Sequence, residues 1–291
     1  MDPREPVDIA VVGAGRVGTA LGVLLAEAGH RVVAASGRSG SRARVERFLP
    51  GLPFVANAEA AAAASVVIIG VPDDSIAATC LEVAGSVHAG KFVMHLSGSA
   101  SLDALAAARE AGARTLSMHP LQTFPGVVQA IERLPGSGMA VTAEDEASYA
   151  LGERLARDAG GRPFRLSDEQ KPLYHVAAVF CSNYLAAVQR VAEELFHTAG
   201  LDNPVPLFAP LARATLDNVL ELGPSSALTG PAARGDAGTV QRNLEALRDQ
   251  APWALPAYVA LAHVAAEMAQ GGGRLDAAGR ERVEKVLAEW R

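Results

Sequence analysis

A glycine-rich turn near the start of the chain constrains the fold more than any other stretch. The sequence Gly13-Ala14-Gly15-Arg16-Val17-Gly18 has the spacing G-x-G-x-x-G, follows the apolar run 7–12 and precedes a helical pattern over 19–28. In such strand–turn–helix units the first glycine permits the tight turn, the second lets a pyrophosphate approach the backbone, and the third lets the helix pack closely on the sheet. The helix N-terminus adds free N–H groups and a partial positive charge. The stretch predicts a dinucleotide site made by Gly13, Gly15, Arg16, Val17 and Gly18, with a purely structural turn as the alternative.

The first part of the chain alternates between short apolar runs and helical patterns. Strands are predicted at 7–12, 31–35, 66–71, 92–96, 115–118, 139–142 and 163–166, and helices at 17–28, 41–49, 58–64, 75–86, 101–111 and 144–159. The run 66–71 is apolar throughout, as expected of a parallel strand that is buried on both faces. The alternation predicts an α/β fold with a Rossmann-type, doubly wound and mostly parallel sheet.

The pattern changes at Ser167, after which no convincing strand follows. Helices are predicted at 168–199, 206–222, 239–250, 253–270 and 276–290, and three glycines at 271–273 break the last two apart. We therefore expect a dinucleotide-binding domain over 1–167 and an all-helical domain for substrate binding and dimerisation over 168–291. The long apolar helix at 168–199 should bury one face in its own domain and another against a second copy, which predicts a two-fold homodimer.

Composition excludes several classes of function. A net charge of -6 argues against a nucleic-acid partner, and the seven histidines show no metal-binding spacing, so no metal site is expected. The first six residues are polar and lack the apolar core of a signal peptide, and the run 60–71 is too short to cross a membrane. Cys80 and Cys181 lie in apolar surroundings, and we expect two buried free thiols in a cytoplasmic protein.

The end of the second predicted strand indicates which dinucleotide binds. NAD enzymes usually place an acidic residue there to bind the ribose 2′-OH, but the sequence after Ala35 has no carboxylate until Glu46. Arg38 can instead pair with a 2′-phosphate, and Ser36 and Ser39 can add hydroxyl donors. A solvated basic loop is the alternative. The pattern favours NADP.

Ligands of such sheets lie beyond the carboxyl ends of the strands, and three of these ends are unusual here. The first has small or rigid residues beside the cofactor, the second offers hydroxyls and bare backbone, and the third offers an imidazole and an amide: Gly70, Val71 and Pro72; Ser97 and Gly98; His119 and Gln122. Ser97 is alternatively a turn residue, and His119 is alternatively a structural histidine. We expect the cofactor at the first two ends, Ser97 and His119 in the catalytic site, and Gln122 against the substrate.

The helix that follows Ser167 carries polar residues that point broadly the same way. Lys171, His175, Ser182 and Asn183 fall at i, i+4, i+11 and i+12 of a helix that is otherwise apolar. They either line a cleft or bond to one another and to the sheet domain. We place Lys171, His175 and Asn183 among the catalytic residues and Ser182 against the substrate, and we favour His175 because Pro172 leaves the direction of Lys171 uncertain. Further on, Arg234 either binds a substrate carboxylate or pairs with Asp236.

Several of these motifs together carry a family resemblance that covers essentially the whole chain. Its most specific parts are His119-Pro120-Leu121-Gln122-Thr123-Phe124, Tyr174-His175 with Ser182-Asn183-Tyr184, and Gly230-Pro231 with Arg234-Gly235-Asp236. The sequence resembles the Rossmann-like proteins with a helical C-terminal domain of unknown function, which are related to pyrroline-5-carboxylate reductase, ketopantoate reductase and the deazaflavin-dependent NADP reductases. The resemblance implies an NADP-type fold and dimerisation through the helical domain, but it implies no substrate.

The chain departs from two related groups. Gly230-Pro231 stands where pyrroline-5-carboxylate reductase has a glycine- and threonine-rich loop, and His175 stands where hydroxyacid dehydrogenases have an asparagine one turn after the catalytic lysine. We therefore expect an NADP(H)-dependent oxidoreductase that reduces a small carbonyl or imine compound, with His175 as general acid and with Ser97, His119 and Asn183 positioning the substrate. An NADP-binding sensor or regulatory protein without turnover is the alternative.

Overall fold

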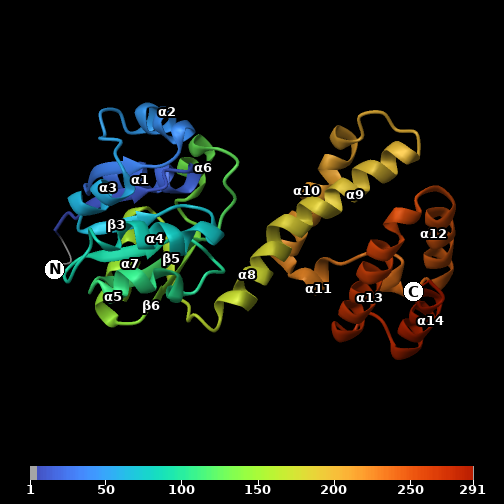
Figure 1. Ribbon diagram of the computed structural model, residues 1–291. Helices are drawn as coiled ribbons and strands as arrows, with labels where there is room; N and C mark the ends of the chain where they lie inside the picture. The colour runs from blue at the N-terminus through green and yellow to red at the C-terminus, as the bar shows by residue number, and fades with distance from the viewer. Residues whose placement is uncertain (1–4, 291) are drawn as a thin grey trace. The chain divides into compact units, whose positions relative to one another are not determined.

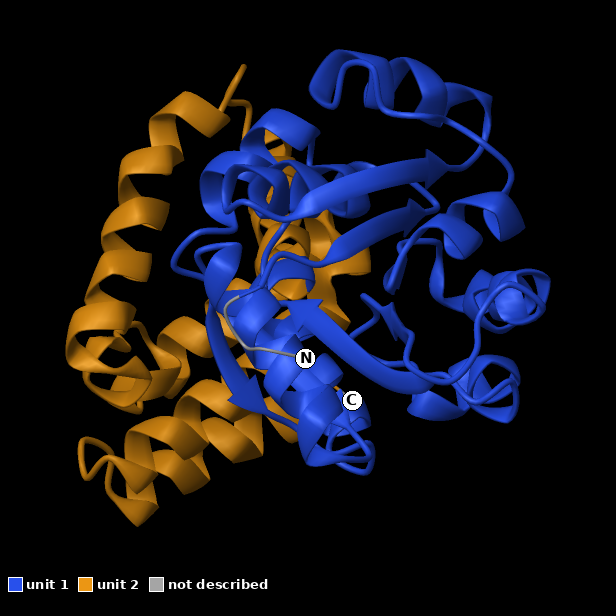
Figure 2. Ribbon diagram, turned by 90° about the vertical axis from the view of Figure 1, so that its left-hand side faces the viewer, with its two compact units in different colours: residues 1–183 blue, residues 184–291 orange. Residues whose placement is uncertain are grey.

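The computed structural model describes residues 5–290. The chain divides into two compact units, a sheet unit that ends at Asn183 and a helical unit that begins at Tyr184 (Figure 2). Strands give way to helices near Ser167, as predicted, since the last strand ends at Arg165. The first helix after this change, α8 (Lys171–Val179), nevertheless belongs to the sheet unit.

The sheet unit is built on one seven-stranded sheet with the order β2-β1-β3-β4-β5-β6-β7. All neighbouring strands are parallel except β5 and β6, which are antiparallel. The chain starts at β1 and turns first to one side and then to the other, so the topological switch point lies between β1 and β3. The bounds of the strands are β1 Asp8–Val12, β2 Arg31–Ser36, β3 Val66–Ile69, β4 Phe92–His95, β5 Arg114–Pro120, β6 Gly138–Ala143 and β7 Arg162–Arg165.

Helices cover both faces of this sheet, which confirms the predicted α/β architecture (Figure 1). One apolar core contains residues of α1, α6 and α7, and the core of the other face contains residues of α3, α4 and α5. The bounds of these helices are α1 Arg16–Glu27, α2 Ser39–Phe48, α3 Asn57–Ala63, α4 Ile76–Ala84, α5 Ala106–Glu110, α6 Val127–Arg133 and α7 Glu146–Asp158. Helix α6 lies in a segment for which the sequence pattern predicts neither a helix nor a strand.

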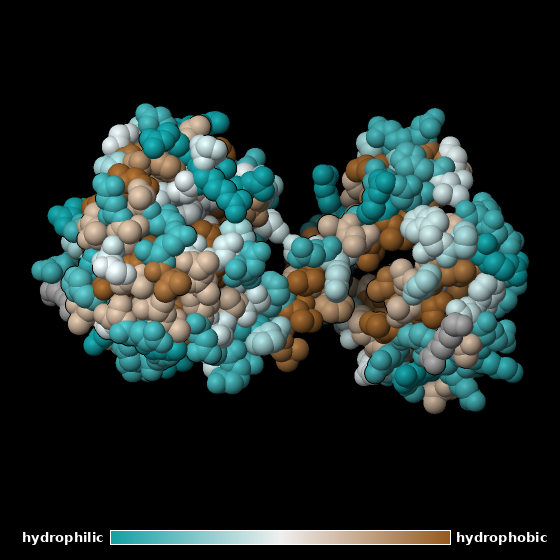
Figure 3. Space-filling model, viewed as in Figure 1, coloured by the Kyte–Doolittle hydropathy of each residue, from teal (hydrophilic) through white to brown (hydrophobic). Residues whose placement is uncertain are grey.

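The helical unit has a small core of its own. Val240 and Leu244 of α12, Ala266 of α13 and Val283 and Leu287 of α14 are fully buried there. Its helices are α9 Leu185–Thr198, α10 Val205–Leu222, α11 Pro224–Ala227, α12 Ala237–Gln250, α13 Leu255–Gly271 and α14 Ala277–Ala288. No residue of α9 or α10 is buried, and Figure 3 shows apolar side chains open on the surface of this unit.

The predicted helix at 168–199 is interrupted by a π-helical segment, Phe180–Tyr184, which joins α8 to α9. Such segments insert an extra residue into the helix and are frequent at functional sites. The segment also overturns one expectation: Cys80 is buried, but Cys181 is exposed. The apolar neighbours that suggested burial, Phe180 and Tyr184, are themselves exposed, so Cys181 lies on an uncovered helix surface.

Within residues 5–290, no helix is long and apolar enough to cross a membrane. In the same part of the chain, no group of three or more histidine, cysteine or acidic side chains could hold a metal ion.

Candidate functional site

The glycine turn joins β1 to α1 at the switch point of the sheet. Gly13 has a φ of 80°, and a Cβ at this position would lie 2.4 Å from Cγ1 of Val71. A Cβ at Gly18 would lie 3.0 Å from Cγ1 of Val11. The predicted reasons for glycine at the turn and at the helix–sheet contact are both confirmed. At Gly15, by contrast, packing does not require a glycine. A Cβ added there would meet no atom closer than the carbonyl oxygen of Gly70 at 3.5 Å, which is ordinary van der Waals contact.

The N-terminus of α1 is open to a ligand. No side chain caps the helix, and its first turn carries no acidic residue. The backbone N–H groups of Arg16, Val17 and Gly18 have no acceptor among the described residues, since the first helical bond runs from Thr19 to Gly15. Uncapped amides with a free helix dipole form an anion site. The guanidinium of Arg16 is exposed and donates to the carbonyl oxygen of Phe124 over 3.4 Å.

Arg38 follows β2 and is the N-cap residue of α2. It is exposed and makes no hydrogen bond or ion pair to another described residue, whereas Arg42 stacks on Phe54 and Arg44 donates to the carbonyl oxygen of Ala14. Ser39 opens α2 and is exposed. The structure places the hydroxyl of Ser36 differently from what a donor to a 2′-phosphate requires, because Ser36 is 1% exposed and its Oγ is buried.

Asp73, which is not among the predicted site residues, follows β3 and contacts the loop that follows β4. Asp73 Oδ2 accepts hydrogen bonds from Ser97 Oγ at 2.7 Å and from Ser99 Oγ at 2.6 Å. Burial alone would raise the pKa of Asp73, but the two serine hydrogen bonds outweigh it and lower the pKa below its ordinary value. Ser97 Oγ also accepts from the backbone N–H groups of Ser99 and Ala100. The only proton of the Ser97 hydroxyl is therefore committed to Asp73.

His119 lies inside β5, where it pairs with Ala140 of β6, and not in the loop expected for it. Its Nδ1 is 2.7 Å from the hydroxyl oxygen of Tyr174 on α8. A Cβ at Gly98 would lie 2.8–2.9 Å from three atoms of the imidazole. The packing of His119 is thus enough to explain a glycine at position 98, whether or not a cofactor also contacts it as predicted.

The start of α8 is fixed to the loop that follows β4. Lys171 is 1% exposed, and its Nζ donates to the carbonyl oxygen of Ala100 at 2.6 Å. Asp168 lies 3.9 Å from this Nζ through Oδ1, and its Oδ2 accepts from the backbone N–H of Leu102. Burial lowers the pKa of Lys171 to about 8, although Asp168 and Asp73 oppose the shift. Pro172 lies in the first turn of α8, and the direction of Lys171 that it left uncertain in the sequence is inward.

His175 lies one turn after Lys171 and is half-buried. Its Nδ1 is buried and has no hydrogen-bond partner among the described residues. A positive charge on His175 would lower the pKa values of Asp73 and His119, so the three side chains are close enough to interact electrostatically. Lys171, Tyr174, His175, Asp73 and His119 all belong to the sheet unit.

The other predicted site residues lie elsewhere. Ser182 and Asn183 are in the π segment, half-buried and exposed respectively. Gln122 is half-buried, and its side-chain oxygen accepts a hydrogen bond from the backbone N–H of Thr123. Gly70 and Val71 pack against the glycine turn, and Pro72 precedes Asp73.

The Gly230–Asp236 segment has structural reasons for its composition. Gly235 has a φ of 71°, and a Cβ there would lie 2.8 Å from Leu275. Asp236 caps α12 by accepting from the backbone N–H of Thr239 at 3.0 Å. Hydrogen bonds from the side chain and backbone of Thr239 lower the pKa of Asp236, and the charges of Arg242 and Arg234 lower it further. Arg234 itself is exposed.

Sequence reasoning missed Asp73, Tyr174 and Asp168 as members of the site. Asp73 had a usable signal, because it follows a buried strand at the ligand-binding edge. Tyr174 was part of a motif that carries the family resemblance, but its partner could not be foreseen, and Asp168 had no signal, because each meets a partner 55 or more residues away in the sequence.

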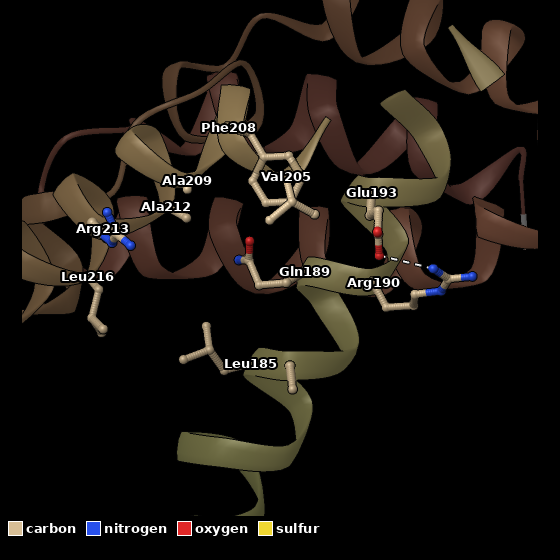
Figure 4. Close-up of a pocket in the computed structure, with 11 residues that line it drawn as sticks. Leu185, Gln189, Arg190, Glu193, Val205, Phe208, Ala209, Ala212, Arg213 and Leu216 are labelled. Carbon is tan, nitrogen blue, oxygen red and sulfur yellow. Dashed lines mark hydrogen bonds and ion pairs between the residues drawn. The ribbon is translucent and has the colours of Figure 1, made fainter. Parts of the chain in front are cut away.

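A groove lies between α9 and α10 of the helical unit, with a volume of about 530 Å³ (Figure 4). Apolar side chains dominate its lining, and Figure 4 shows Leu185, Val205 and Phe208 around it. Arg190 on its rim is paired with Glu193 at 3.0 Å. None of the predicted catalytic residues lines this groove.

Two family models match the chain. Residues 2–120 match the Rossmann-like domain, and residues 137–265 match the domain of unknown function DUF2520. The DUF2520 match begins at β6, so it takes in the last two strands of the sheet as well as α8 and most of the helical unit.

Curated relatives resemble part of this chain. A protein named glycerol-3-phosphate dehydrogenase [NAD(P)+] from Rhizobium etli (strain CIAT 652) is 33% identical over 180 residues, which cover 54% of this chain and 52% of that protein. The protein of the same name from Rhizobium johnstonii is 32% identical over 181 residues, with 55% and 52% covered. The chain thus spans about half the length of these curated relatives.

Solved structures share the fold over most of the chain. Protein BF3122 from Bacteroides fragilis has a TM-score of 0.75 at 24% identity and covers 90% of this chain and 98% of its own. Protein TM1727 from Thermotoga maritima has a TM-score of 0.68 at 24% identity, with 91% and 100% covered. A reductive aminase from Aspergillus terreus, solved with NADPH and ethyl levulinate, has a TM-score of 0.65 at 19% identity, with 99% and 100% covered.

Proposed function

We propose that the protein binds a dinucleotide across the carboxyl edge of its sheet, with the pyrophosphate on the N-terminus of α1. The observation that carries this proposal is Gly15. Packing does not require glycine there, because a Cβ would meet nothing closer than 3.5 Å, whereas a phosphate approaching the free amides of Arg16, Val17 and Gly18 would need the space.

The proposed dinucleotide is NADP(H). Arg38 is exposed and unpaired among the described residues at the end of β2, where a ribose 2′-phosphate would lie. Its planar fork of donors suits a phosphate, and the segment from Gly37 to Val45 carries no carboxylate that would repel one. The curated relatives are named as NAD(P)+ enzymes, and the reductive aminase was solved with NADPH.

The proposed activity is the reduction of a small carbonyl or imine compound. The reduced dinucleotide supplies the hydride when it is bound, and the protein supplies orientation and a proton. His175 is the proposed general acid, since its ring nitrogen Nδ1 is free within the described residues beside Asp73 and His119. His119 and Asn183 are proposed to position the substrate, and Ser97 acts by holding Asp73.

The proposed assembly is a homodimer through the helical unit. Helices α9 and α10 have no buried residue, although α10 exposes Leu207, Leu211 and Leu220 at 64%, 69% and 75%. Apolar helix faces of this size need cover. A second copy of the chain is the proposed partner, and the remaining partner is the small-molecule substrate.

The variant Gly15→Ala tests the dinucleotide proposal directly. The added methyl group should block the approach of the pyrophosphate and weaken NADPH binding at least tenfold in titration calorimetry, while the thermal unfolding midpoint stays close to wild type. Gly40→Ala on α2 is the matched control, because a Cβ at Gly40 meets nothing within 4 Å and, like one at Gly15, would not clash with the protein. Unchanged NADPH affinity in Gly15→Ala would contradict the proposal, and binding without turnover of any carbonyl or imine would favour a sensor.

A further inference from the structure

His119 and Tyr174 form a pair that lies between the sheet and α8. His119 is in β5 and Tyr174 is 55 residues further along the chain, yet Nδ1 and the phenol oxygen are 2.7 Å apart. The rings meet edge to face, with centroids 5.5 Å apart and planes at 86°. Tyr174 also packs edge-on against Phe164 of β7, with centroids 6.0 Å apart. The pair is thus fixed by one hydrogen bond and two ring contacts.

Gly98 also packs against the imidazole of His119. A side chain at position 98 would collide with three imidazole atoms at 2.8–2.9 Å, so the ring lies directly on the glycine backbone. The other ring nitrogen, Nε2, makes no hydrogen bond to any residue between 5 and 290. An imidazole that is fixed at one nitrogen and free at the other can present a single defined group to a ligand.

The surroundings hold both rings neutral. Burial lowers the pKa of His119 to about 4 and raises the pKa of Tyr174 to about 12. The ionisable groups that face His119 are His175 and Lys171 on α8, Asp73 after β3 and His95 on β4; His175 and Lys171 lower the pKa further and Asp73 raises it. At neutral pH the hydrogen bond therefore joins a neutral phenol to a neutral imidazole.

The direction of this hydrogen bond decides what Nε2 can do. A phenol is a strong donor and a weak acceptor, because its oxygen lone pair is delocalised into the ring, whereas the unprotonated nitrogen of a neutral imidazole is a strong acceptor. The favoured arrangement is Tyr174 O–H donating to Nδ1 of His119. The proton of the imidazole then resides on Nε2.

We propose that Tyr174 is a positioning residue that fixes His119 as the Nε2–H tautomer, so that His119 presents a neutral hydrogen-bond donor to the heteroatom of the substrate. This proposal rests on the proposed reductase function. When hydride adds to the carbon of a C=O or C=N group, the bonding electron pair moves onto the heteroatom. The Nε2–H group stabilises that charge, and the proton from His175 completes the O–H or N–H bond. Neutral histidines polarise carbonyl groups in this way.

The proposal also defines the form in which the substrate enters. A group that accepts a hydrogen bond from Nε2–H must carry a free lone pair. A carbonyl oxygen and the nitrogen of a neutral imine have one, but a protonated imine does not. The structure therefore favours a carbonyl compound or an unprotonated imine over a cationic one.

Nuclear magnetic resonance of the full chain, labelled with ¹⁵N-histidine, tests the tautomer without a substrate. The signals of His119 are assigned by their loss in His119→Gln. In the wild type we expect the Nε2–H tautomer and no titration between about pH 5.5 and 8.5, since the ring stays neutral in that range. In Tyr174→Phe we expect the tautomer ratio to shift at least fivefold toward Nδ1–H, because the donor to Nδ1 is gone.

Tyr149→Phe is the matched control, because Tyr149 is a half-buried tyrosine of the same unit that contacts Arg165 and not His119. It should leave the His119 signals unchanged. An Nδ1–H tautomer in the wild type, titration of His119 near pH 6.5, or an unchanged ratio in folded Tyr174→Phe would overturn the proposal. The wild-type spectrum decides even if Tyr174→Phe fails to fold.

A second readout separates this proposal from the proposed function. NADPH affinity, measured by fluorescence titration, should be the same in Tyr174→Phe and the wild type. If the wild type does not bind NADPH, the proposed function fails whatever tautomer His119 adopts. If NADPH binds and a substrate is found, Tyr174→Phe should lower kcat by about tenfold or more while the KM for NADPH stays unchanged.

Discussion

Single residues at the ligand-binding edge differ in how far the sequence reveals them. Gly13 and Gly18 were predictable, because their reasons for being glycine are local: a φ of 80° in one case and contact with the adjacent strand in the other. The hydrogen bonds of Ser97 with Asp73 and of His119 with Tyr174 were not predictable, because they join segments 24 and 55 residues apart. Only the fold brings such side chains together.

Arg38 gives a prediction about cofactor choice. Replacing it with alanine should weaken NADPH binding by about 1.5–3 kcal/mol, the usual contribution of a hydrogen bond to a charged group, because the 2′-phosphate loses its partner. NADH lacks this phosphate, and its affinity should stay nearly unchanged. Titration calorimetry with both cofactors measures the difference. Arg47→Ala in α2 is the control, since it removes an arginine that stacks on Phe48 at the other end of that helix. Equal losses for NADPH and NADH would refute the assignment to NADP.

Lys171 gives a prediction about pH. Its pKa is about 8 in the folded chain and near its ordinary 10.5 when unfolded, so between these values the unfolded chain binds more protons. The free energy of unfolding should therefore rise with pH in this window, by up to about 3 kcal/mol relative to Lys171→Met, which has no proton to lose. Urea titrations of both proteins at pH 7.5 and 10.5 give the comparison. A difference that stays constant with pH would contradict the lowered pKa of Lys171 in the folded chain.

At the scale of elements, the seven strands were predicted well because each is an apolar run that ends at a turn signal. The π segment Phe180–Tyr184 was not predicted, since nothing in residue spacing marks where a helix gains one extra residue. This insertion changes the angular offset of Ser182 and Asn183 from Lys171 and His175, so spacing counted for a regular α-helix does not by itself give the four residues a common face. Helix α6 was missed because it is short, with only Val127 and Ala130 buried.

Helix α8 carries the prediction about chemistry. His175→Ala should lower turnover of a substrate by roughly 10²–10⁴-fold, the usual contribution of a general acid, because the heteroatom that gains negative charge loses its proton donor. NADPH affinity should stay close to wild type. His175→Asn should lose most activity as well, since an amide is a far weaker acid. Near-normal turnover in folded His175→Ala, with folding checked by circular dichroism, would mean that the proton comes from another group.

At the scale of the whole molecule, the two units differ in how they are stabilised. The sheet unit has an apolar core on each face of its sheet, and α12, α13 and α14 form a core in the helical unit. Helices α9 and α10 contribute no buried residue to any core, although Phe196 and Phe208 stack between them with centroids 5.5 Å apart. A pair of apolar helices without a core of its own needs cover from a partner to be stable.

The uncovered apolar faces of α9 and α10 lead to a prediction about assembly. If the proposed dimer covers α9 and α10 with a second copy, light scattering at micromolar concentration should give the mass of a dimer for the wild type. Leu211→Glu should give a monomer, since a charge in the covered apolar surface loses its hydration. Leu81→Glu on α4 is the matched control: both leucines are 69% exposed, but Leu81 lies in the sheet unit. A wild-type monomer would contradict the proposed dimer, and a dimer that survives Leu211→Glu but not Leu81→Glu would place the interface on the sheet unit.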